Sequence, residues 1–285
     1  LKPMEKTASI ARWDANISGK DEDFKRKEQA QNKIDEALAD AAAFREVKEI
    51  KEKGGISAPV LARQIEVLYL QYLEKQVDPE LLKKMVEKSN AVEKAFNVYR
   101  ANVAGEEISE NDVRKLLKQS KSSDERRKAW EGSKGVAKIV EPDLKELAKL
   151  RNQAATTLGF KNFHQMMMFL AEQDQGQVLK LFDELDELTR EPFRAAKAEI
   201  DERLAANCGI KMAELRPWHY HDPFFQESPA VFGVDIDSVY ETADILKLCK
   251  DFYVGIGLPI DDVIARSDLY EKQGKSPHAF CTDID

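Results

Sequence analysis

Helical periodicity over the first 205 residues is the feature that most restricts the folds open to this chain. Apolar side chains recur at the spacing of one helix face, for example at Leu61, Ile65, Leu68 and Tyr72. Only 13 Gly and 10 Pro occur in 285 residues, whereas an all-β fold needs many more turn residues. We therefore predict a mainly α fold, with a helical array over residues 1–207.

Start and stop signals divide this array into separate helices. The clearest start is a capping-box pattern, with Ser109 three residues before Asp112. Prolines 59, 79 and 142 are expected in first helical turns, and glycines just beyond helix ends. The predicted helices cover 3–17, 21–50, a segment capped by Ser57, 78–103, segments opening at Ser109 and Asp124, 142–158, 161–172 and 175–206.

The composition of the sequence changes after Gly209. Residues 208–236 form an aromatic loop punctuated by prolines, too long to be a simple connector. Residues 237–285 are expected to hold a helix over 237–256, a short helical turn, and an extended strand from about 276. We find no repeat, linker or convincing domain boundary, so residues 1–285 are predicted to be one unit.

Charge and composition exclude two classes of partner. The net charge is -8 and basic residues are mixed with acidic ones, so no stripe could follow a nucleic-acid backbone. No apolar run approaches the roughly 20 residues of a membrane span. Three cysteines without metal spacing suit a reducing compartment, while Leu1 in place of Met suggests a trimmed N-terminus. Localisation stays open: a soluble protein, with the cytoplasm favoured over a periplasmic or secreted location.

One histidine pair invites a metal-site interpretation. His219 and His221 would face the same way on an extended segment, so one ion could contact both rings. A zinc site needs three or four ligands, and the others are not evident. The alternative, which we favour, is that His219 and Asp222 fix the loop by hydrogen bonds while Trp218 and Phe224 pack. We assign no metal ligand and no catalytic residue to this chain.

Five segments carry motifs that belong together. Their sequences are ARWDANI at 11–17, DERRKAWE at 124–131, LRNQAATTLGFKNF at 150–163, RPWHYHDPFFQ at 216–226 and GKSPHAFC at 274–281. In this order they resemble the N-terminal portion of the angiotensin-converting-enzyme-like and oligoendopeptidase-like zinc peptidases. The resemblance covers most of the chain.

The resemblance implies a helical lobe of a two-lobed molecule, with a deep channel between the lobes. It also implies zinc in the full-length enzyme, held by the two His of His-Glu-x-x-His and by a downstream Glu. The 285 residues do not contain that motif. We therefore expect the chain alone to bind no catalytic zinc and to cleave nothing. Its expected partners are its own missing C-terminal half, a short peptide substrate, and a second copy of itself.

The end of the chain resembles the family segment that leads into the active-site edge strand. An exposed strand edge can pair with the backbone of an extended peptide whatever its side chains. We predict substrate binding by His278, Ala279, Phe280 and Cys281, with His278 bonding a carbonyl near the scissile bond. His219 and Tyr220 are candidates for lining the channel. The alternative is that residues 278–285 are an ordinary core strand.

Two functions follow from these observations. The first is the front half of a zinc-dependent oligopeptidase or peptidyl-dipeptidase-like enzyme that hydrolyses short peptides. The second is a non-catalytic helical module that binds peptides or proteins. A reading frame that continues into His-Glu-x-x-His would favour the first, and a native chain that ends at Asp285 would favour the second.

Overall fold

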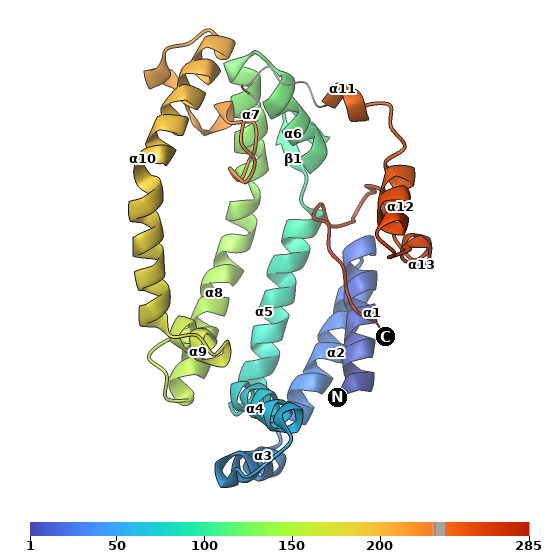
Figure 1. The fold of residues 1–285 in the computed structure, drawn as a ribbon. Helices are drawn as coiled ribbons and strands as arrows, with labels where there is room; N and C mark the ends of the chain where they lie inside the picture. Colours follow the sequence, from blue (N-terminus) through green and yellow to red (C-terminus); the bar gives the residue numbers. More distant parts are fainter. Residues whose placement is uncertain (230, 232–236, 285) are drawn as a thin grey trace.

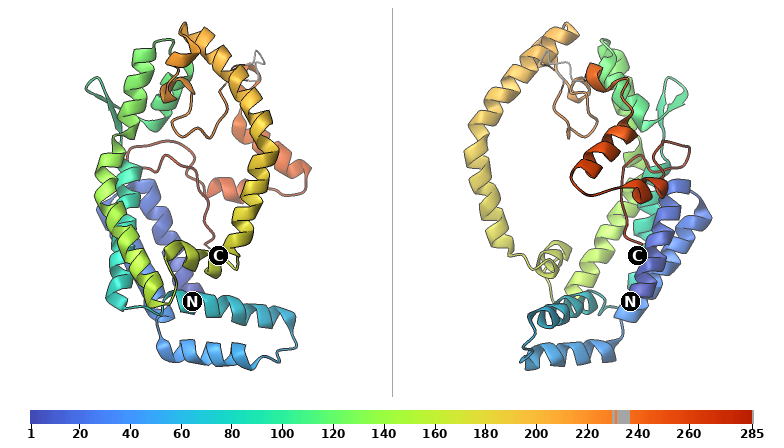
Figure 2. Two further views of the ribbon diagram at one scale, coloured as in Figure 1. Left: turned by 90° about the vertical axis from the view of Figure 1, so that its left-hand side faces the viewer. Right: turned by 45° about the vertical axis from the view of Figure 1, so that its right-hand side comes forward.

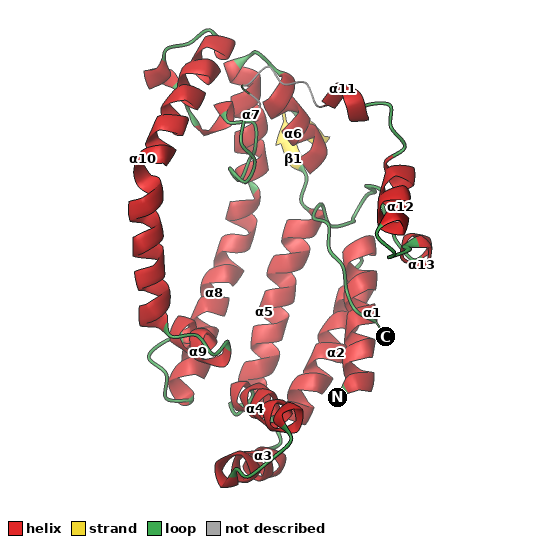
Figure 3. Cartoon of the chain, in the orientation of Figure 1, coloured by secondary structure: helices red, strands yellow, loops and turns green. Residues whose placement is uncertain are grey.

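Helices make up most of the chain, as the sequence predicts (Figure 3). The computed structural model describes residues 1–229, 231 and 237–284. Among these residues, no helix is both long and apolar enough to cross a membrane. The elements, labelled in Figure 1, are α1 (Lys2–Ser18), α2 (Asp21–Leu38), α3 (Ala41–Lys53), α4 (Pro59–Glu74), α5 (Pro79–Val98), β1 (Ala101–Val103), β2 (Glu106–Ile108), α6 (Glu110–Gln119), α7 (Ser123–Lys134), α8 (Val136–Thr157), α9 (Phe163–Leu170), α10 (Gln175–Cys208), the 3₁₀ turns η1 (Met212–Glu214) and η2 (Pro217–His219), α11 (Asp237–Tyr240), α12 (Ile245–Gly255) and α13 (Asp261–Ala265).

Four long helices pack in the order α1, α2, α5 and α8, and they form the body of the molecule (Figure 1). A buried apolar cluster joins α5 to α8 and contains Val77, Leu81, Leu82, Leu150 and Ala154. Helix α5 begins as predicted, because the Asp78 carboxylate accepts a hydrogen bond from the Leu81 N–H and Pro79 occupies the first turn. The periodic apolar positions thus become the helix-packing faces.

A β-hairpin follows α5 where the sequence pattern suggested more helix. The predicted end at residue 103 was wrong, since α5 stops at Val98 and β1 pairs antiparallel with β2. Ala104 and Gly105 connect the strands with φ angles of 55° and 94°. This left-handed backbone turns the chain back on itself, which a continuing helix cannot do.

The hairpin packs on α6 and α7 to form a second buried cluster. Ala101 of β1 contacts Val113 and Leu117 of α6, and both α6 side chains are fully buried. Helix α6 begins at the predicted capping box, in which Ser109 and Asp112 each bond the other's backbone N–H. The prediction of this helix start is confirmed.

Three other predicted helix boundaries were wrong. The segment 21–50 is divided into α2 and α3, because Asp40 accepts hydrogen bonds from the N–H groups of the first turn of α3. Ala58, not Ser57, is the N-cap of α4. Pro142 lies inside α8, which begins at Val136. There the packing of α8 along α5 outweighs the single backbone hydrogen bond that proline removes.

The C-terminal part differs most from the prediction. The helix expected over 237–256 is two helices, α11 and α12, and the Asp244 side chain caps the second. The expected terminal strand is not formed by residues 276–284, since β1 and β2 pair only with each other and leave no described strand to complete a ladder. Asp285 and residues 230 and 232–236 of the predicted loop lie outside the described part.

Helix α10 runs apart from α8 in all three views (Figures 1 and 2). It packs on the η1 turn near its C-terminal end, and its Lys197 and Asp201 side chains bond the Tyr220 hydroxyl. Large apolar side chains in its first two thirds are exposed: Leu179, Leu181, Phe182, Leu185, Leu188 and Phe193. Large apolar side chains exposed together on one helix are typical of a surface that another element contacts, whereas Leu204 and Ala205 near the end of α10 are buried.

The C-terminal segment of the described chain meets the first helix near the end of α1. Buried Asn16 accepts a hydrogen bond at its backbone carbonyl from the Ser276 N–H, at 2.8 Å. Its side-chain amide donates to Glu93 of α5 at 3.1 Å and accepts from Asn97 at 2.7 Å. One residue of α1 therefore fixes both α5 and the terminal segment.

Two glycines allow this close approach. Gly19 ends α1 with φ 68°, and Gly274 faces it with φ 81°. A Cβ on Gly274 would lie 2.5 Å from the Ser18 carbonyl oxygen, which is backbone and cannot turn away. The backbone contact between α1 and the terminal segment therefore requires glycine at position 274.

We expect Gly274→Ala to detach residues 274–284 from α1. Gly257→Ala is the matched control, because Gly257 has φ 80° but open space around it. Both variants bear the cost of left-handed backbone, about 1–2 kcal/mol, and only Gly274→Ala adds a clash worth about 1–2 kcal/mol more. Urea unfolding together with limited proteolysis after residue 274 measures the difference. Equal effects in the two variants would contradict this account.

Candidate functional site

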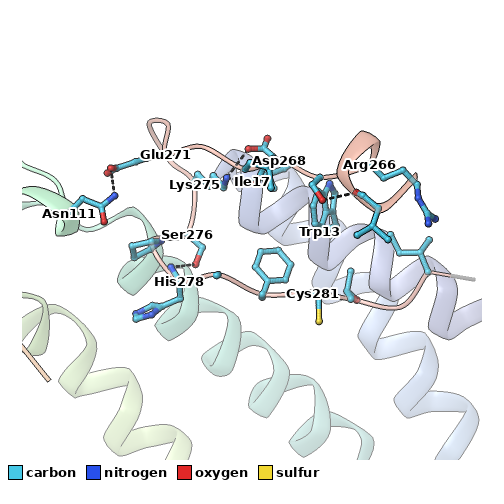
Figure 4. A pocket seen from close by; sticks show the side chains of 18 residues that line it. Trp13, Ile17, Asn111, Arg266, Asp268, Glu271, Lys275, Ser276, His278 and Cys281 are labelled. Atoms are coloured by element: carbon cyan, nitrogen blue, oxygen red, sulfur yellow. Dashed lines mark hydrogen bonds and ion pairs between the residues drawn. The ribbon is translucent and has the colours of Figure 1, made fainter. Parts of the chain in front are cut away.

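The terminal segment lines a pocket of about 450 Å³ (Figure 4). Its wall includes all four residues predicted to bind substrate, His278, Ala279, Phe280 and Cys281. The facing walls come from α1, through Trp13 and Ile17, and from the chain around α13, including Arg266 and Asp268. The pocket is therefore built by segments more than 240 positions apart in the sequence.

Contacts at both ends hold the segment in place. The Phe280 ring packs on Trp13 with ring centroids 5.6 Å apart, and the Arg12 guanidinium lies 6.0 Å from the Phe280 ring centre. Before it, the Lys275 ammonium donates to the carboxylate of Asp268 at 2.8 Å and to its carbonyl at 2.7 Å. The Phe280 side chain thus holds the segment against α1. A ligand at this position would therefore bond mainly to the backbone of the segment.

His278 lies between two aromatic rings from other parts of the fold. Its ring is nearly parallel to that of Phe96 of α5, with an interplanar angle of 16° and centroids 5.6 Å apart. On the loop side, the Phe224 ring centroid is 6.3 Å away. Figure 4 shows the imidazole and the Cys281 thiol on the side of the segment opposite Trp13.

The backbone between His278 and Thr282 has hydrogen-bonding capacity left over. The His278 N–H makes a long bond of 3.4 Å to the Ser276 hydroxyl. Within the described residues, the N–H and C=O groups of 279–282 have no backbone partner. Unpaired groups on an extended, exposed segment are those that a peptide strand can bond.

His219 lies buried inside the loop, and the suggestion that it lines a channel stays a prediction. It is 1 % exposed. Its Nδ1 accepts from the Arg216 N–H at 2.8 Å, so Nε2 carries the proton and lies 2.9 Å from the Ser123 hydroxyl. Burial lowers the pKa of His219, and the nearby Arg126 guanidinium lowers it further. The predicted structural role of His219 is confirmed.

Asp222 organises the turn that carries Phe224. Its buried carboxylate accepts from the backbone N–H groups of Phe224, Gln226 and Glu227, at 3.1, 2.7 and 2.9 Å. Arg114 of α6 lies 3.3 Å from the same carboxylate. Burial alone would raise the pKa of Asp222, but these bonds and the guanidinium hold it below its ordinary value. The predicted role of Asp222 in fixing the loop is confirmed.

Tyr220 connects the loop to α10. Its hydroxyl accepts from the Lys197 ammonium at 2.8 Å and donates to the Asp201 carboxylate at 2.7 Å. The ring lies half-buried against Phe225. The suggestion that Tyr220 lines a channel stays a prediction.

Sequence reasoning missed two residues around this site, Phe96 and Glu110. Phe96 stacks on His278, yet nothing in its neighbourhood distinguishes it from a core phenylalanine. Burial raises the pKa of Glu110, and the Arg114 guanidinium, whose Nε lies 3.4 Å from its carboxylate, opposes that rise. Glu110 follows the capping serine, so its sequence signal was that of a helix start.

Within the described residues, no group of three His, Cys, Asp or Glu side chains could hold a metal ion. Both ring nitrogens of His219 already have partners in the loop. Cys208, Cys249 and Cys281 are free thiols. The residues that the structure describes therefore do not fit a zinc centre, which needs three protein ligands or more.

Comparison with known proteins gives one family. The family model described as angiotensin-converting enzyme, a peptidase family, matches residues 1–192. The match extends from α1 into α10 and covers two thirds of the 285 residues, while the pocket segment 276–284 lies beyond it. No curated protein matches the chain.

Acid is expected to destabilise the fold through His221. Its Nδ1 is buried without a hydrogen-bond partner in the described structure, and burial, with Arg126 and Lys118 nearby, lowers its pKa from 6.5 to about 4. The unfolded chain then binds the proton more tightly, so the free energy of unfolding falls as pH drops from about 6.5 towards 4, by about 2–3 kcal/mol.

His221→Asn is the variant that tests this, because Asn tolerates the φ of 64° at this position and does not titrate. Chemical denaturation at pH 7 and pH 4 should show a smaller loss of stability in the variant, with the contribution of His219 remaining. If both proteins lose the same stability between these pH values, His221 is not the group responsible.

Proposed function

The chain belongs to the angiotensin-converting enzyme family of peptidases, and from this membership we propose that it is the N-terminal part of a zinc-dependent oligopeptidase acting on short peptides. In this proposal the helical array forms one lobe and one wall of a substrate channel. The remaining wall and the zinc ligands come from polypeptide outside these 285 residues. The chain alone binds no catalytic zinc and hydrolyses nothing.

The observation that supports this best is the free backbone edge of residues 279–282. It lines the pocket, it is fixed at Phe280 and His278, and its N–H and C=O groups have no backbone partner within the described residues. A peptide bound along this edge would be recognised by its backbone, which suits an enzyme with broad side-chain tolerance. His278 would bond a carbonyl of that peptide.

Zinc chemistry is assigned to the missing part. In the proposed full-length enzyme, bound zinc would supply polarisation of the peptide carbonyl and activation of water. The described residues offer no such centre, so no step of the reaction is assigned to a metal bound by them. What this chain contributes is the binding and orientation of the peptide backbone.

The exposed face of α10 supports a partner for this lobe. Leu188 is 74 % exposed and Phe193 66 %, values unusual for large apolar side chains on a stable surface. In this proposal α10 packs against the C-terminal half of the enzyme. A second copy of the chain would cover the same face when that half is absent.

The test compares two proteins: this chain and the product of its uninterrupted reading frame. Peptide hydrolysis and about one bound zinc are expected in the longer product alone. In that product, His278→Ala should raise KM about tenfold with little change in kcat, since a hydrogen bond to bound peptide is lost. Steady-state kinetics on a short fluorogenic peptide and metal analysis provide these values.

The results also separate the two functions that the sequence leaves open. A longer product that neither binds zinc nor cleaves peptides would overturn the peptidase proposal. A frame that ends at Asp285, together with peptide binding by this chain, would instead favour the non-catalytic binding module.

A further inference from the structure

We propose that Phe96 and Phe224 are positioning residues for His278, and that they set the direction in which its imidazole meets a bound peptide. The inference rests on the proposed function, because it concerns how the peptide edge is prepared for its ligand. It goes beyond that function in assigning residues of α5 and of the 222–227 turn to substrate binding.

The first support is the geometry of the rings. The Phe96 and His278 rings are separated by 5.6 Å at 16°, which is the arrangement of an offset stack. The Phe224 ring centroid lies 6.3 Å from that of the imidazole, at an interplanar angle of 54°. Contact with two other rings restricts the rotation of the imidazole about χ1 and χ2 before any ligand arrives.

The second support is that the stacking leaves the ring nitrogens of His278 free. His278 is exposed and lines the pocket, and its ring nitrogens have no hydrogen-bond partner within the described residues. His219 differs, since both of its nitrogens are used by the loop. Aromatic contacts therefore fix the plane of His278 while its polar atoms stay available to an external acceptor or donor.

The third support is that Phe224 is itself fixed. Its backbone N–H donates to the buried Asp222 carboxylate at 3.1 Å. The Lys134 ammonium of α7 lies 4.1 Å from the centre of its ring and donates to the Pro223 carbonyl at 2.6 Å. The position of the imidazole thus depends on α5, α7 and the turn, and not only on the terminal segment.

The experiment is a double-mutant cycle in the product of the uninterrupted reading frame, with zinc bound. Phe96→Leu should raise KM about fivefold and leave kcat within about twofold, because a loosely held imidazole binds the peptide less well. Phe96→Tyr keeps the stack and should behave as the wild type. In a His278→Ala background, Phe96→Leu should have no further effect, since the residue acts through His278.

Phe44→Leu is the matched control for loss of a stacked ring. Phe44 is half-buried like Phe96, and its ring stacks on Tyr69 of α4 at 5.7 Å and 24°. This change should lower stability without altering KM. If Phe96→Leu does not fold, Phe224→Leu tests the same claim, because that side chain is 38 % exposed and its removal leaves the core intact.

Two results overturn the inference, and they are distinguishable. If the wild type hydrolyses peptides but Phe96→Leu raises KM equally with and without His278, the phenylalanine acts through the fold. If the wild type hydrolyses nothing, the proposed function fails and the inference fails with it. A rise in KM that depends on His278 in both the Phe96 and the Phe224 variants supports the proposal.

Discussion

The hydrogen bonds of Asn16 are the interactions on which the candidate site depends. Its side chain joins α1 to Glu93 and Asn97 of α5, and its carbonyl accepts the Ser276 N–H at the start of the terminal segment. A buried amide must satisfy its polar atoms, so its partners specify one arrangement of these three elements. The glycine contact at Gly19 and Gly274 then allows the two backbones to meet.

A second polar centre, around Asp222, supports the site from the other side. A buried carboxylate that accepts three backbone N–H groups and faces Arg114 gives a turn a defined shape without a large apolar core. Phe224 is placed by that shape against His278. The proposed peptide edge therefore rests on aromatic contacts whose own positions are set by buried polar groups.

Helix α10 is less well packed than the body of the molecule. The body contains two buried clusters, one between α5 and α8 and one between the hairpin and α6, whereas α10 exposes large apolar side chains in its first two thirds. Burying a side chain such as Leu188 contributes about 1.5–3 kcal/mol, so a covering partner would stabilise this part substantially. Under the proposed function, this face would contact another part of a longer polypeptide.

The sequence by itself determined the mainly α fold, the capping of α5 and α6, the peptidase family and the loop-fixing roles of His219 and Asp222. These depend on local signals: helical periodicity, side chains that bond nearby N–H groups, and short motifs. Only the tertiary structure decided that helix 21–50 breaks at Asp40, that a hairpin follows Val98, that the terminal segment has no strand partner, and that Phe96 meets His278. The Asp40 cap and the turn at Ala104 and Gly105 are local, but helical periodicity alone does not distinguish them from a continuing helix. The contact between Phe96 and His278 joins residues far apart in the chain, and its energy depends on packing that no local pattern encodes.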